Sequence, residues 1–133
     1  MSSVKNKLFI IFLFAGMLLF TIPANAQIPD EIILSLKSGN ARSLSEHFNQ
    51  NVELVIPESD NVYSKAQAQL ILNDFFNSYS PQSFSVIHQS GKEGAMSVIG
   101  NLGTKKGNFR VYFLLKKSDE KNYIHQLRIE KQE

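Results

Sequence analysis

The spacing of apolar residues changes along the chain, and each spacing predicts a different element. The clearest pattern follows Ser64, which forms with Gln67 a Ser-x-x-Gln capping box ahead of an apolar run. Apolar residues then recur on one helical face, at Ala68, Ile71, Leu72, Phe75, Phe76 and Tyr79. Because Pro81 cannot continue a helix, we predict the main core helix between Ser64 and Pro81.

Two shorter helices are predicted nearer the start of the chain. Pro29 suits the first position of a helix, residues 30–31 are acidic, and Gly39 can end the helix with a positive φ. Asn40 can cap a second helix directly afterwards. The apolar positions of that second helix are Ala41, Leu44 and Phe48.

Elsewhere the apolar residues alternate with polar ones, which is typical of strands. One strand is predicted from Val52 to Ile56, before Pro57, and residues 62–63 form a short edge. Four further strands follow Pro81, at 83–91, 95–104, 108–117 and 122–131, with short turns between them. Short turns predict an antiparallel meander with one face in the core, on which the helices lie. We therefore expect one α+β domain over residues 27–133.

The segment 1–26 has the pattern of a secretory signal peptide. Lys5 and Lys7 precede a 15-residue apolar run, residues 8–22, and the small-residue site Ala24-Asn25-Ala26 follows. The alternative is a membrane anchor, but an anchor needs about 20 apolar residues. We predict cleavage after Ala26, a mature chain that begins at Gln27 without a membrane span, and export to the periplasm or cell envelope.

Removal of this segment changes the charge. The whole chain has 14 Lys and Arg against 12 Asp and Glu, and both Lys5 and Lys7 leave with the segment, so the mature chain has no net charge. A sequence-independent nucleic-acid binder needs excess positive charge, so we exclude that class. The absence of cysteine excludes disulfides, thiolate nucleophiles and thiolate metal sites. Isolated histidines without a third ligand predict no metal site, and no motif predicts a cofactor.

Several segments of the mature chain resemble a family of exported bacterial proteins, domain-of-unknown-function family 4783. These segments are Ile28-Pro29-Asp30-Glu31-Ile32-Ile33, Asn51-Val52-Glu53-Leu54, Val62-Tyr63-Ser64-Lys65-Ala66-Gln67-Ala68, Gly91-Lys92-Glu93-Gly94, Phe109-Arg110-Val111-Tyr112-Phe113-Leu114-Leu115-Lys116 and His125-Gln126-Leu127-Arg128-Ile129-Glu130-Lys131. The resemblance implies a nuclear transport factor 2-like (cystatin-like) cone, with three helices on a curved antiparallel sheet. It implies no reaction and no catalytic residues.

The carboxylates argue against an isomerase of the cone type. Such an enzyme needs a carboxylate in the apolar hollow, with an acidic hydrogen-bond donor facing it. Glu53 and Glu130 alternate away from their apolar neighbours, and Asp74 lies between the apolar positions of the core helix. Most other carboxylates fall in helix starts, turns or the tail. We therefore predict no catalytic residue.

Four residues form the candidate pocket: His88, Arg110, Tyr112 and His125. His88 and His125 share the parity of apolar neighbours and can face the core, although we favour a position at the sheet margin. Arg110 and Tyr112 can line the open end of the cone and hold an anionic or carbonyl ligand. We favour the alternative, in which both lie on the outer face and Arg110 pairs with a cross-strand acid such as Glu130. A one-residue change of register would reverse each placement.

Three functions remain compatible with these observations. The first is a non-enzymatic binding module for a small molecule or an envelope protein partner, and we favour it. The second is an enzyme in which His88 or His125 acts as the base and Tyr112 as the donor. The third is a structural homodimer that buries the outer face of the sheet.

Overall fold

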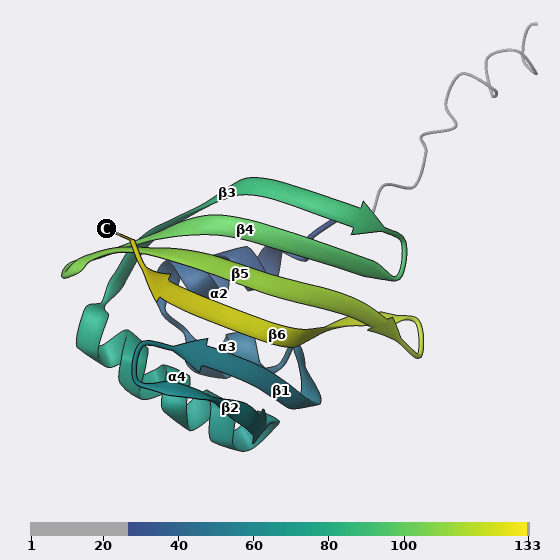
Figure 1. Cartoon of the computed structure of the whole chain (residues 1–133), viewed down its shortest axis with the longest axis horizontal. Helices are drawn as coiled ribbons and strands as arrows, with labels where there is room; N and C mark the ends of the chain where they lie inside the picture. The colour runs from purple at the N-terminus through teal and green to yellow at the C-terminus, as the bar shows by residue number, and fades with distance from the viewer. Residues whose placement is uncertain (1–26, 133) are drawn as a thin grey trace, which may run out of the picture.

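A computed structural model of the protein describes residues 27–132 (Figure 1). Its elements are α2 (Asp30–Ser38), α3 (Ala41–Ser45), β1 (Phe48–Ile56), β2 (Ser59–Ser64), α4 (Lys65–Tyr79), β3 (Pro81–Lys92), β4 (Ala95–Thr104), β5 (Gly107–Ser118) and β6 (Lys121–Lys131). The predicted signal peptide, residues 1–26, lies outside the described residues.

The helix ends follow the local signals in the sequence. Gly39 ends α2 in the left-handed region, with φ of 68°, and its N–H caps the carbonyls of the last turn. The Asn40 side chain accepts a hydrogen bond from the Ser43 amide, at 3.0 Å, and so begins α3. At the start of α4, both hydrogen bonds of the Ser64–Gln67 capping box are present. These three predictions are confirmed.

Phe48 does not extend the second helix as predicted. The helix α3 ends at Ser45, and Phe48 is the first residue of β1, where it pairs with Ile124 of β6. The Ile124 amide also donates a hydrogen bond to the His47 carbonyl, at 2.7 Å. Pairing with β6 therefore brings Phe48 into the sheet, where its side chain is buried.

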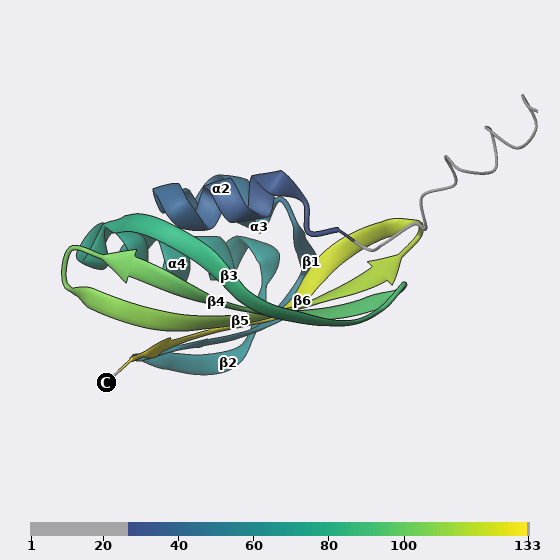
Figure 2. The ribbon, with the colours of Figure 1, turned by 90° about the horizontal axis from the view of Figure 1, so that it is seen from above.

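The six strands form one mixed sheet in the order β2-β1-β6-β5-β4-β3. Strands β3 to β6 form the predicted antiparallel meander. Strand β1, however, pairs parallel with β6, so the sheet is not wholly antiparallel as expected. The helices α2, α3 and α4 lie on one face of the curved sheet, and no element within residues 27–132 covers the other face (Figure 2).

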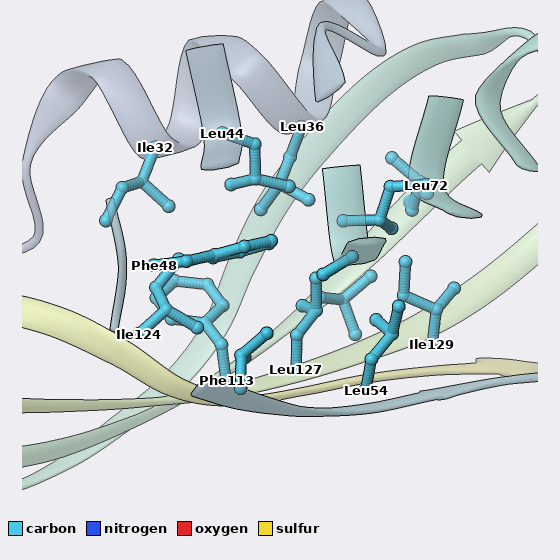
Figure 3. Packing of buried hydrophobic residues seen from close by; sticks show 14 of the residues in the cluster. Ile32, Leu36, Leu44, Phe48, Leu54, Leu72, Phe113, Ile124, Leu127 and Ile129 are labelled. Carbon is cyan, nitrogen blue, oxygen red and sulfur yellow. The ribbon is translucent and has the colours of Figure 1, made fainter. Parts of the chain in front are cut away.

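The core fills the space between the helices and the sheet (Figure 3). Ile32, Leu36 and Leu44 point down from α2 and α3. Phe48, Phe113 and Ile124 meet them from the strands, with at most 1% of each side chain exposed. Large side chains therefore occupy the middle of the domain, and the surfaces left for binding are at its edge and on the uncovered face.

Candidate functional site

The uncovered face of the sheet, called the outer face here, carries rows of side chains that run across the strands. Residues that pair directly across neighbouring strands share a face. One row consists of His88, Ile99, Tyr112, Arg128 and Val55. The next row consists of Asn101, Arg110 and Glu130. All these residues are half-buried or exposed, in contrast to the core positions between them.

His88 reaches the outer face because the register of β3 shifts. Val86 pairs with Gly100, but His88 pairs with Ile99, so Ile87 is an extra residue in a β-bulge. Without the bulge, His88 would face the core as Phe84 does, because the two residues are an even number of positions apart. The extra residue places His88 on the opposite face. His88 is consequently exposed on the edge strand, on the same face as Ile99.

His125 is also the extra residue of a bulge. Leu114 pairs with Gln126 and Leu115 pairs with Ile124, which leaves His125 unpaired between them. Its Nε2 atom is buried and has no hydrogen-bond partner among the described residues. Burial, and secondarily the positive charge of Lys116, lower the pKa of His125. At neutral pH, the neutral imidazole is therefore the favoured form of His125.

Arg110 and Tyr112 both lie on the outer face. The Arg110 Nε donates a hydrogen bond to Asn101 Oδ1, at 3.2 Å. Glu130, its cross-strand neighbour, instead forms an ion pair with Arg128, with 3.3 Å between Nη1 and Oε1. Tyr112 lines an open hollow of about 330 Å³ together with Gln126 and Arg128.

The structure does not bring the four candidate residues into one pocket. His88 and Tyr112 share a row but are two strands apart, which is about 10 Å, with Ile99 between them. Arg110 belongs to another row, and His125 lies in its bulge near Lys116. Within residues 27–132, no group of three or more His, Asp or Glu side chains is arranged to hold a metal ion.

A more enclosed pocket lies between α4 and two turns, and we call it the α4 pocket. It has a volume of about 340 Å³. Its lining residues are Ile56, Pro57, Glu58, Ser59, Ile71, Asp74, Phe75, Ser78, Tyr79 and Lys106. They come from residues 71–79 of α4, from the β1–β2 turn with the strand residue on either side of it, and from the turn between β4 and β5.

Aromatic packing holds the floor of the α4 pocket in place. The rings of Phe75 and Tyr79 meet the buried ring of Phe109 edge to face, with centroids 5.2 and 4.9 Å away. The Lys105 amide donates hydrogen bonds to the carbonyls of Tyr79, at 3.1 Å, and Ser80, at 3.2 Å. The turn that carries Lys106 is thereby attached to the end of α4, so floor and wall form one unit.

The charged groups of the α4 pocket come from three separate elements. Asp74 lies on α4, Glu58 in the β1–β2 turn and Lys106 in the β4–β5 turn. The ion pairs found within residues 27–132 are His47–Glu31, Lys117–Glu93 and Arg128–Glu130. The pocket residues Glu58, Asp74 and Lys106 thus form no ion pair with one another, and their charges remain available to a ligand.

Sequence reasoning missed the α4 pocket. The apolar face of α4 was predicted correctly, and Ile71, Phe75 and Tyr79 were assigned to the core. A clue is that Asp74 and Ser78 lie beside this stripe, at the edge of the buried surface. No local pattern, however, shows that the two turns reach the same edge.

Comparisons with known proteins agree with this fold. The sequence model of the family described as "Domain of unknown function (DUF4783)" matches residues 29–130. A DUF4783 protein from Bacteroides ovatus is 34% identical, with a TM-score of 0.77, over 82% of this chain and 99% of that one. Another, from Bacteroides uniformis, is 34% identical, with a TM-score of 0.76, over 80% and 99%.

More distant structures share the fold alone. A domain of unknown function with a cystatin-like fold, from Nostoc punctiforme, is 10% identical, with a TM-score of 0.63, over 78% of this chain and 72% of that one. The α+β fold with a curved, mostly antiparallel sheet is thus that of NTF2-like and cystatin-like proteins. No curated protein matches the chain. Among residues 27–132, no helix has the length and apolar character that crossing a membrane requires.

Proposed function

We propose a function for this chain, which belongs to the DUF4783 family, a family of unknown function. The chain is a non-enzymatic binding module, and the α4 pocket is its ligand site. One observation carries the proposal: the α4 pocket has an apolar and aromatic floor and is open to solvent. Its volume of about 340 Å³ lies within the range of small-molecule sites, roughly 300–1,000 Å³. The separation of His88 from Tyr112 supports binding over catalysis.

The proposal includes export. With the signal pattern at residues 1–26, we propose that the mature chain begins at Gln27 and meets its ligand in the periplasm or cell envelope.

Native mass spectrometry of residues 27–133, purified from an exporting host, tests the ligand site. We expect a surplus mass that is lost on denaturation. Ser78→Trp places a large side chain at the pocket and should reduce the captured mass, because Ser78 lines it. Asn77→Trp is the matched control, since Asn77 is also exposed on α4 but does not line the pocket. No surplus mass, or equal capture by the two variants, would overturn the proposal.

A second candidate function is self-association through the outer face. The specific observation is that Arg110 pairs with Glu130, and Tyr112 with Arg128, across β5 and β6 of this face. A two-fold axis along the strands, between β5 and β6, would make the face self-complementary. Such an axis places β5 of one copy over β6 of the other. Arg110 then faces Glu130 of the other copy, and Tyr112 faces Arg128, an opposite-charge pair and a cation–π pair. An axis along β6 would instead place Arg128 of one copy against Arg128 of the other, two like charges.

Cross-linking tests this second candidate. The proposed axis places Ile99 of one copy over Val55 of the other, whereas within one copy they are three strands apart, about 14 Å. Ile99→Cys and Val55→Cys each introduce one thiol into a chain without cysteine. A short bis-maleimide should join the two variants when mixed, and much less when either is alone. Sedimentation as a monomer at high micromolar concentration would exclude this function.

A further inference from the structure

We infer that the α4 pocket selects small molecules with a compact apolar body and one protonated amine. This inference rests on the proposed function, because it names the ligand class of the same pocket. Three features carry it: the floor, the carboxylates and the end of α4.

The floor is suited to an apolar body. Ile71, Phe75 and Tyr79 follow one another at four-residue spacing on α4 and so lie along one side of the helix. The rings of Phe75 and Tyr79 pack in a tilted arrangement, with 4.8 Å between their centroids, and both contact Phe109. A ligand that covers this floor removes apolar surface from water without rearranging the aromatic cluster.

The walls favour positive charge over negative charge. The carboxylates of Asp74 and Glu58 come from different elements, against the single ammonium of Lys106. The pocket also includes the last turn of α4, where the helix dipole is negative. The last turn of α4 contains no basic residue. An ammonium group in the pocket is therefore close to two carboxylates and to a helix C-terminus, each of which attracts positive charge.

A carboxylate ligand would meet the opposite situation. Its carboxylate can form an ion pair with Lys106, but the carboxylates of Asp74 and Glu58 and the negative end of the α4 dipole repel it. A neutral ligand of the same shape keeps the contact with the floor and gains no charge-assisted hydrogen bond. The order of affinity expected from the wall is amine, then neutral molecule, then acid.

Three probes of similar size test this order on residues 27–133: 2-phenylethylamine, 2-phenylethanol and 3-phenylpropionate, titrated by NMR. We expect the amine to bind about tenfold more tightly than the alcohol, as one charge-assisted hydrogen bond predicts. Asp74→Asn and Glu58→Gln should each reduce this preference. The control variants are Asp119→Asn and Glu120→Gln, in the β5–β6 turn away from the pocket, which should leave it unchanged.

The outcomes separate the two proposals. Equal affinity of amine and alcohol, with both weakened by Ser78→Trp, overturns the amine preference and leaves the pocket as a binding site. Tightest binding of 3-phenylpropionate also overturns the preference and assigns recognition to Lys106. No binding of the three probes overturns the inference. If the surplus mass is also absent or insensitive to Ser78→Trp, the proposed function fails as well.

Discussion

The ring of Phe84 lies in the space that a side chain on Gly100 would occupy. An ideal Cβ on Gly100 would lie 2.7 Å from Cε1 of Phe84 and 2.7 Å from the carbonyl oxygen of Ser85. Phe84 is the single buried residue of β3, and Gly100 is a buried position of β4. The edge strand is therefore held on the core by one aromatic ring, which needs a glycine on the neighbouring strand.

Gly100→Ala should destabilise the protein by about 1–3 kcal/mol, the usual cost of overpacking a core. The new methyl group meets the ring of Phe84 on one side and the backbone of β3 on the other, so the strand must shift. Chemical denaturation of residues 27–133 measures this loss of unfolding free energy.

The control is the same change in a Phe84→Ala background. Without the ring, the methyl group of Gly100→Ala still meets the Ser85 carbonyl oxygen but no longer meets Phe84, so the cost should fall below its value in the wild-type background. Equal costs in the two backgrounds would contradict the packing of Phe84 over Gly100.

Ser64→Ala should cost about 1 kcal/mol, because Ser64 caps α4 and accepts a hydrogen bond from the Gln67 amide. Thermal and chemical unfolding both report this loss. Asn73→Ala is the control, since Asn73 is exposed within the same helix and caps nothing, and its effect should stay within about 0.5 kcal/mol. A loss no larger than that of the control would refute the role of the cap.

His125 should make the folded protein less stable in acid. Burial and Lys116 lower its pKa in the folded state, so between that value and the unfolded value the unfolded chain binds more protons. Stability is therefore complete above the unfolded pKa of about 6.5 and decreases as the pH falls through the folded pKa. Denaturant unfolding at a series of pH values measures this slope.

Substitution of single histidines tests whether His125 causes this pH dependence of stability. His125→Gln removes the titrating group and should flatten the slope between neutral and mildly acidic pH. His88→Gln is the matched control, because it makes the same change at an exposed position of β3. An unchanged slope in His125→Gln would assign the acid sensitivity elsewhere.

Local patterns predicted the elements well because each depends on residues close in sequence. The capping box of Ser64 and Gln67, the positive φ of Gly39 and the four strands after Pro81 belong to this class. The parallel pairing of β1 with β6 does not, because it joins one of the earliest strands in the sequence to the last one. No periodicity in either strand identifies its neighbour.

The candidate site was harder to predict than the fold. At Ile87 and His125, one extra residue changes the parity of a strand while the sequence continues to alternate. The face of His88 was therefore not determined by its spacing from Phe84. The α4 pocket depends on two turns that meet one helix, which is a property of the folded chain alone.

Cleavage after Ala26 remains a prediction from the segment 1–26, and mass spectrometry of the exported protein checks it. A bacterial host given the whole chain should release a mature protein that begins at Gln27 and ends at Glu133. Ala26→Arg places a large charged residue where the site needs a small one, so the uncleaved chain should accumulate. Asn25→Ser, at the variable middle position, should be cleaved normally. A wild-type product that still begins at Met1 would contradict cleavage after Ala26.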